Sequence, residues 1–188
     1  FVEAVAAVGC RTVIVHARKA WLKGLSPKEN RDIPPLDHSR VQRLKADYPQ
    51  LEIITNGGLT TTTQVLEQLD YVDGVMLGRQ AYQHPYLLAE IDRALFGGVP
   101  PPSRKAVLVA FIEYLQHEAS RGTPLKSMSR HLMGLYASQP GGRRWRRFLS
   151  ELPHGEKGLR ALLDYKVPTK ESLIQTTHLT QRNLAGER

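Results

Sequence analysis

The chain has 188 residues, of which 41% are hydrophobic, and its 15 glycines and 12 prolines are ordinary for a globular protein. This composition excludes collagen-like and disordered chains, and no apolar run reaches the roughly 18 residues of a membrane-spanning helix. The N-terminus lacks the basic start of a secretory signal, and the single cysteine, Cys10, excludes an internal disulfide or a cysteine-rich metal site. We therefore expect a soluble, cytoplasmic protein without a metal.

The net charge of +8 is confined to the second half of the chain. Residues 1–98 hold 11 basic and 11 acidic side chains, whereas residues 99–188 hold 15 basic and 7 acidic ones. A local excess of lysine and arginine is typical of domains that bind polyanions. The second half is therefore predicted to contact nucleic acid.

Strands and helices alternate along residues 1–98. Phe1–Cys10 has the pattern of the last turns of an amphipathic helix without a start signal, so we expect that a preceding part of the protein is absent. The elements predicted after it are strands at Thr12–His16, Glu52–Thr55 and Gly74–Leu77, and helices at Asp37–Tyr48, Thr62–Leu69 and Pro85–Phe96. This alternation is typical of parallel βα units.

Three parallel strands are too few for a complete domain, because both faces and both edges of such a sheet need cover. A TIM (β/α)8 barrel takes about 250 residues, so residues 1–98 would supply about three of its eight units. Since the predicted helices of the second half follow them, we expect the C-terminal three units of an α/β barrel. A small, open, doubly wound sheet is the alternative.

A second, all-α domain is predicted after a proline-rich linker at residues 99–103. The helices expected in it are Arg104–Arg121, which is apolar enough to be well buried, and then Leu125–Ser138, Arg143–Leu152 and Glu156–Lys166. Residues 104–168 would form a helical bundle. Residues 169–188 are polar and without periodicity, and we expect a loose tail.

Polar and glycine residues follow each predicted strand, where a parallel barrel gathers its functional groups. They are His16 after the first strand, Asn56, Gly57 and Gly58 after the second, and Gly78 and Arg79 after the third. Glycine turns expose backbone N–H groups to a phosphate, and an arginine binds one bidentately. Taken alone, Gly57-Gly58 or Gly78-Arg79 is more often a simple turn, and His16 is as often a structural histidine, but together these signals favour a phosphate-bearing ligand.

The connection from Lys19 to Leu36 is far longer than the roughly 2–6 residues usual between a strand and a helix. It combines Trp21 with basic residues that include Lys28 and Arg31, a mixture suited to phosphate contact and base stacking. A solvated loop stiffened by prolines is the alternative.

The run Arg143–Arg147 places four arginines around Trp145. On a helix, Arg143, Arg146 and Arg147 share one side, and Trp145 is predicted to enter the core. The cluster favours RNA binding, although such a run is also typical of a solvated face. Cys10 precedes a strand, at the end opposite the ligand-binding edge, and is expected to be a structural thiol.

Several segments resemble the A-type bacterial tRNA-dihydrouridine synthases. They are VHARKAWLKGLSPKENRDIPPL, ITNGG, VDGVMLGRQAY, RHLMGLY and GGRRWRRFLS. The resemblance implies an FMN-binding TIM barrel followed by a helical tRNA-binding domain. It also implies an oxidoreductase that uses NADPH to reduce uridine to 5,6-dihydrouridine in the tRNA D-loop, at positions 20 and 20a for this subtype.

The resemblance also implies roles for individual residues. His16 would lie against the flavin, Asn56, Gly57, Gly58, Gly78 and Arg79 would hold its ribityl phosphate, and Lys28, Arg31, Arg143 and Arg146 would contact tRNA. The general-acid cysteine of the family lies in an Asn-x-x-Cys-Pro segment that this sequence lacks. We therefore expect no catalytic residue here and no activity from this chain alone, with a monomer as the working expectation. The alternatives are a stand-alone RNA-binding module and another phosphate-binding barrel enzyme.

Overall fold

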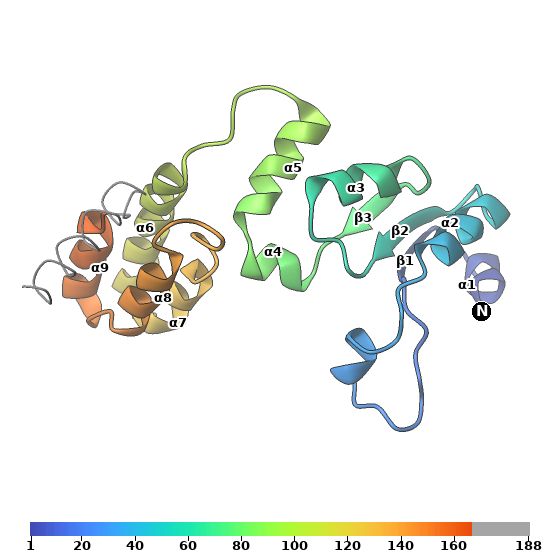
Figure 1. Ribbon diagram of the computed structural model, residues 1–188, viewed down its shortest axis with the longest axis horizontal. Coiled ribbons are helices and arrows are strands. Elements are labelled where there is room, and N and C mark those ends of the chain that lie inside the picture. The colour runs from blue at the N-terminus through green and yellow to red at the C-terminus, as the bar shows by residue number, and fades with distance from the viewer. Residues whose placement is uncertain (167–188) are drawn as a thin grey trace, which may run out of the picture. The chain divides into compact units, whose positions relative to one another are not determined.

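The computed structural model describes residues 1–166, and the expected polar tail at 169–188 lies outside the described residues (Figure 1). The described chain divides into two compact units. Residues 1–81 and 87–99 make an α/β unit, and residues 82–86 join those from 100 onward in a helical unit.

The α/β unit contains a sheet and the helices that connect its strands. In chain order its elements are α1 (Val2–Ala7), β1 (Thr12–His16), a 3-10 turn (Glu29–Arg31), α2 (His38–Asp47), β2 (Glu52–Asn56), α3 (Thr62–Leu69), β3 (Gly74–Met76), the start of α4 (Arg79–Gln83) and α5 (Tyr86–Phe96) from its second residue. The strands and helices predicted between Thr12 and Phe96 are confirmed, and no end differs from its predicted position by more than one residue. The short helix α4 was not predicted.

The strands form a parallel sheet in the order β1-β2-β3. Ile14 pairs with Ile54, which pairs with Gly74, and the next row on the same face is His16, Asn56 and Met76. Because the strands are parallel, their carboxyl ends meet at one edge of the sheet. The residues expected to bind a ligand are therefore gathered at that edge.

One face of the sheet carries the helices. Val41 of α2 packs with Ile53, and Val65 of α3 packs with Val75, on the same face of neighbouring strands. The opposite face is open among the described residues, since Ile14 is 53% exposed. This one-sided cover favours a barrel-type winding over a doubly wound sheet, which has helices on both faces.

Polar contacts fix the ends of these elements. The side chains of Asp37 and Thr61 accept hydrogen bonds from the backbone at the first turns of α2 and α3. Lys45 pairs with Asp73 at 2.8 Å, and Asp73 also accepts the backbone N–H of Ile53 at 2.7 Å. The Lys45 hydrogen bond and the Ile53 N–H hold the pKa of Asp73 below its ordinary value. This network ties α2 to two strands.

As far as Lys166, the helical unit has a core of twelve buried residues centred on Trp145, which is fully buried. Its elements are α6 (Arg104–Ser120), α7 (Leu125–Ser129), a 3-10 turn (Arg130–Leu132), α8 (Gly142–Ser150) and α9 (Gly155–Asp164). The indole N–H donates to the carbonyl of Leu132 at 2.7 Å, and Tyr136 and Tyr165 pack edge-on against the ring. The prediction that Trp145 enters the core is confirmed. No helix in the described part of the chain is long and apolar enough to cross a membrane.

Two predictions about the helical unit were wrong. Leu125–Ser138 is not one helix, because helical structure ends at Leu132 and Ser138 has a φ of 58°. A Cβ at Gly134 would collide with the backbone carbonyl of Gln83, so this stretch is a close-packed turn. The apolar helix α6 is also buried only along one stripe, and Tyr114 on its other side is 51% exposed.

Candidate cofactor and nucleic-acid sites

The ends of the three strands form one connected edge. The backbone N–H of Ala17 donates to the carbonyl of Asn56 at 2.7 Å, which joins the ends of β1 and β2. Gln80 Nε2 donates to the carbonyl of Thr60 at 3.2 Å, which joins the turns after β2 and β3. The glycines and polar groups after the three strands are therefore held in one region.

His16, Asn56 and Met76 lie side by side in one row of the sheet, on the face that the helices leave open. Met76 is 42% exposed, and the sequence analysis did not single it out. The signal that could have found it is the alternation along the strand, since Met76 shares its face with Gly74. This row can offer an imidazole, an amide and a thioether to a ligand above the sheet.

The turn after β2 accepts only glycine. Gly57 and Gly58 have φ values of +118° and +71°, a region that side chains rarely adopt. A Cβ at Gly57 would lie 3.2 Å from Cε1 of His16, and one at Gly58 would collide with Leu36. The turn is thus packed tightly between β1 and the end of the long loop.

Gly78 has a different environment. A Cβ placed on it would meet no atom of the described residues within 4 Å, and the residue is exposed. Neither a positive φ nor a packing contact within the described part of the chain requires a glycine there. The open space beside its backbone can accept a group from outside.

Cationic side chains surround His16. Loss of part of its water shell lowers the pKa of His16, and the nearby charges of Arg18, Arg79 and Arg31 lower it further. These three guanidinium groups create a positive field at the edge where the strands end. An anionic group such as a phosphate is the ligand that this field favours, with His16 neutral near pH 7.

His38, at the start of α2, is a further residue that the sequence analysis did not identify. Its Nδ1 lies 3.4 Å from Oγ1 of Thr55, which is fully buried in β2. Burial lowers the pKa of His38. The ring therefore sits neutral beneath the glycine turn.

Arg79 contacts the long loop between β1 and α2. Its Nη1 lies 2.7 Å from Oδ1 of Asp32, and its Nη2 donates to the carbonyl of Arg31 at 3.4 Å. The hydrogen bond from Arg79 lowers the pKa of Asp32. The residue expected to bind a phosphate is thus also an anchor for the loop.

The long loop is held by its own hydrogen bonds. Asn30 accepts the N–H of Trp21 at 2.8 Å and donates to its carbonyl at 2.9 Å. Arg18 donates to the carbonyls of Asp32 and Pro34, where the loop returns to the sheet. Lys28 and Arg31 are exposed on this ordered loop.

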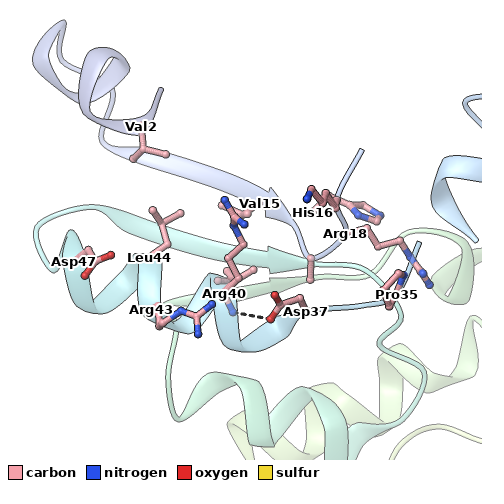
Figure 2. A pocket seen from close by; sticks show the side chains of 13 residues that line it. Val2, Val15, His16, Arg18, Pro35, Asp37, Arg40, Arg43, Leu44 and Asp47 are labelled. Carbon is pink, nitrogen blue, oxygen red and sulfur yellow. Dashed lines mark hydrogen bonds between the residues drawn. The ribbon is translucent and has the colours of Figure 1, made fainter. Parts of the chain in front are cut away.

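A separate hollow of about 690 Å³ lies beside β1 (Figure 2). Its apolar lining includes Val15, Val41 and Leu44, on the face of the sheet that the helices cover. Arg40 and Arg43 of α2 also line it. The hollow shares His16 and Arg18 with the candidate phosphate site but is not lined by the glycine turns, so the two adjoin at the end of β1.

In the helical unit, all four arginines of α8 are exposed while Trp145 is buried between them. Arg143 and Arg146 form no ion pair with any acidic side chain of the described residues, whereas Arg160 of α9 pairs with Glu156 at 2.7 Å. Within residues 1–166, Arg143 and Arg146 are therefore available to contact phosphates.

No group of three or more metal-ligating side chains is found in residues 1–166. The thiol of Cys10 donates to the carbonyl of Thr12 at 3.3 Å and is half-buried. It lies at the opposite end of β1 from His16, as expected of a structural cysteine.

Parallel βα units with cations and glycine turns at the strand ends define an α/β protein suited to a phosphate-bearing ligand. The family model described as dihydrouridine synthase matches residues 1–171, and the chain belongs to the dihydrouridine synthase family.

Curated relatives include proteins named tRNA-dihydrouridine(20/20a) synthase. The chain is 51% identical to that of Shewanella oneidensis over 155 residues, which cover 82% of this chain and 46% of the relative. It is 50% identical to that of Vibrio cholerae over 147 residues, 78% of this chain and 45% of the relative. The protein of Shigella flexneri is 49% identical over 156 residues, 82% of this chain and 46% of the relative. The chain thus spans about half the length of the relatives it matches.

Proposed function

We propose that this chain forms the C-terminal part of a synthase that reduces uridine in tRNA to dihydrouridine, at positions 20 and 20a as in the names of its relatives. Residues 1–98 would supply the last three βα units of an FMN-binding barrel. Residues 104–168 would supply a helical tRNA-binding domain. The observation that carries the proposal is the gathering of His16, the glycine turn and Arg79 at one edge of the sheet.

The groups at this edge fit FMN. Three guanidinium groups favour its dianionic phosphate, and the open space at Gly78 allows that phosphate to approach the backbone. The row of His16, Asn56 and Met76, on the open face of the sheet, would offer polar and apolar contacts to the rest of the cofactor. When bound, FMN would supply hydride transfer from NADPH to the uracil ring.

In this proposal the residues of the chain bind and orient, and the proton donor comes from elsewhere. Asn56, Gly57, Gly58, Gly78 and Arg79 would hold the ribityl phosphate, and neutral His16 would hydrogen-bond beside the flavin. Cys10 lies at the wrong end of β1 to protonate a uracil. The general-acid cysteine would come from a segment of the whole synthase that this chain does not contain, so the chain alone would be inactive.

Two surfaces would contact the tRNA. Lys28 and Arg31 are exposed on the ordered loop next to the candidate cofactor site, and Arg143 and Arg146 are exposed on α8. Arginine and lysine neutralise phosphates whatever the base sequence, so these contacts would position the tRNA rather than read it. The excess charge of residues 99–188 supports this assignment.

The first experiment tests cofactor binding. The chain is joined to the upstream half of the Shewanella oneidensis relative, and this completed synthase is assayed for bound flavin and for dihydrouridine in the D-loop. A yellow protein that forms dihydrouridine supports the proposal. Arg79→Ala should lower the flavin content, whereas Arg93→Ala, at an exposed position of α5, should leave it unchanged. A colourless, inactive product would contradict the proposal and favour a stand-alone RNA-binding module.

The second experiment tests tRNA binding by its salt dependence. Each lost phosphate contact lowers the slope of log affinity against log salt by about 0.7–0.9. In the Arg143→Ala, Arg146→Ala double variant the salt dependence should therefore be shallower, with the magnitude of the slope reduced by about 1.4–1.8. Arg160→Ala, which removes an arginine already paired with Glu156, is the matched control. Equal slopes for all three proteins would reject the role of α8.

A further inference from the structure

Two consecutive residues of the long loop engage one end of the Arg79 side chain. Asp32 accepts from Nη1 at 2.7 Å, and the carbonyl of Arg31 accepts from Nη2 at 3.4 Å. The donor and the acceptors are more than forty positions apart in the chain, so this contact closes the loop onto the end of β3. The guanidinium plane is thereby fixed by two acceptors rather than one.

The loop presents these acceptors in a defined place. Arg18, at the end of β1, donates to the carbonyls of Asp32 and Pro34, and Arg18 also bridges to Leu36. An exposed ion pair between two flexible side chains contributes only about 0–1 kcal/mol to stability. Here the Asp32 carboxylate belongs to a segment that Arg18 holds by hydrogen bonds. The ion pair therefore orients the Arg79 side chain more than it stabilises the fold.

The remaining edge of the guanidinium is free. Within residues 1–166, Arg79 Nε donates to no recorded acceptor, and Nη1 and Nη2 point to the loop. Arg79 also lies close enough to His16 to lower the pKa of that imidazole. An arginine whose Nη1 and Nη2 atoms contact the loop can still use its Nε edge to donate two parallel hydrogen bonds to a phosphate.

We propose that Asp32 is the positioning residue for Arg79, holding its guanidinium so that it bridges the cofactor phosphate and the loop that carries Lys28 and Arg31. The inference rests on the proposed function of Arg79 in phosphate binding and extends it. A phosphate bound to one side of the Arg79 guanidinium would hold that side chain in place. Because Asp32 contacts the other side of the guanidinium, the loop that carries Asp32 would then move less. Because binding couplings are reciprocal, a loop fixed by tRNA also strengthens the hold on the phosphate.

The closing experiment removes the charge of Asp32 and keeps its shape. In the completed synthase, Asp32→Asn should weaken FMN binding by about fivefold to tenfold, the loss of one charge-assisted hydrogen bond. Asp32→Glu, which keeps the carboxylate, should stay within about threefold of the parent protein. Asp47→Asn, a carboxylate-to-amide change elsewhere in the α/β unit, is the matched control and should change nothing. Flavin fluorescence gives the dissociation constants.

A double variant separates positioning from a general loss of structure. If Asp32 acts through Arg79, the Asp32→Asn, Arg79→Ala pair binds FMN no more weakly than Arg79→Ala alone. Additive losses, or Asp32→Asn binding FMN as tightly as the parent or more tightly, would overturn the proposal. The last outcome would mean that Asp32 competes with the phosphate for Arg79.

A second readout needs neither flavin nor the upstream half. Trypsin cleaves after Lys28 and Arg31, so its rate on the 188-residue chain reports how firmly the loop is held. Inorganic phosphate should slow this cleavage in the parent and in Asp32→Glu, and should have no effect in Asp32→Asn. If the completed synthase retains no FMN but phosphate still protects the loop through Asp32, the proposed function fails and the positioning role stands. Protection by phosphate that is equal in Asp32→Asn and the parent rejects the positioning role.

Discussion

The two units of the chain bury their apolar side chains in different ways. In the described part of the helical unit, one cluster of twelve buried residues surrounds Trp145. The α/β unit has two smaller clusters, of five and four buried residues, both on the helix-covered face of the sheet. Its other face leaves Ile14 and Met76 largely exposed. The helices thus close a core within the described residues, whereas the sheet offers a face that further βα units of a barrel would cover.

The units also differ in how they arrange charge. Residues 1–98 are neutral overall, yet their strand ends concentrate Arg18, Arg31 and Arg79 around His16. The helical unit instead displays four exposed arginines along α8. A focused cluster suits one phosphate group, and an extended row suits a polyanion. Local placement, rather than net charge, therefore separates the proposed cofactor site from the proposed RNA surface.

The largest expected effect is the loss of Trp145. Trp145→Ala removes a fully buried indole and its hydrogen bond to Leu132, and should cost about 3–5 kcal/mol of unfolding free energy. Urea unfolding followed by circular dichroism measures it. Trp21→Ala is the control, because Trp21 is 44% exposed in the long loop, and it should cost less than about 1 kcal/mol. If both variants lowered the unfolding free energy equally, the contrast between a tryptophan in a closed core and one exposed on a loop would be wrong.

The second prediction tests the open face of the sheet. Ile53 is fully buried under the helices, so Ile53→Ala should cost about 2–5 kcal/mol. Ile14 is 53% exposed on the opposite face, and Ile14→Ala should cost less than about 1 kcal/mol in this chain. In the completed synthase the cost of Ile14→Ala should rise toward that of Ile53→Ala. A cost that stays small there would argue against a barrel interior above Ile14.

The third prediction concerns pH, which should affect the two units in opposite directions. The pKa values of His16, His38 and Asp73 are all lowered in the α/β unit. A group with a lowered pKa loses its contribution as the pH falls, because the unfolded chain takes up protons that the folded chain resists. The α/β unit should therefore lose stability below pH 6.5 through the histidines and again below pH 3.8 through Asp73.

Burial raises the pKa values of Tyr136 and Tyr165 in the helical unit. Above their ordinary value of 10.0 the unfolded chain ionises first, so this unit should lose stability in alkali. Urea unfolding between pH 3 and 11, followed for each unit by the amide NMR signals of its own residues, measures both trends. Lys45→Gln, which removes the partner of Asp73, should flatten only the acid limb. Parallel pH profiles for the two units would contradict this assignment.

Local sequence patterns predicted most of the secondary structure. A short run of consecutive β-branched residues predicted β1, Thr12–His16, with its observed bounds, and the helix Thr62–Leu69 was also predicted to the residue. These elements depend on nearby residues and standard caps. The segment Leu125–Ser138 was mispredicted because Gly134 packs against Gln83, a contact between distant positions that no local periodicity reveals. Tertiary contact thus overrode helix periodicity there.

In the candidate site, too, the features that follow from local sequence and topology were predicted, and those that depend on tertiary contacts were not. The glycines and Arg79 were identified because strand ends of parallel units meet at one edge, a rule of topology. The roles of Asp32 and Arg18 were missed, since both depend on how an 18-residue loop folds back onto the sheet. The role of His38 was missed because it depends on how α2 packs against β2. The position of a single acidic or basic residue in such a loop does not predict which side chain it will contact. Asp32 meets Arg79 only in the folded structure.

The smallest expected effect is the loss of a helix N-cap, which should lower the unfolding free energy by the same amount in the two units. Ser103 caps α6 by accepting the N–H of Ala106 at 3.1 Å, and Thr61 caps α3 by accepting the N–H of Gln64 at 3.2 Å. Replacing either with alanine should cost about 1 kcal/mol, since a cap acts on the first turn of its own helix whatever the core beyond it. Glycine at either position should cost only a few tenths of a kcal/mol. If each change moves only the transition of its own unit, followed by residue-specific amide exchange, the units unfold independently. A cap change that shifts both transitions equally would show a single cooperative unit instead.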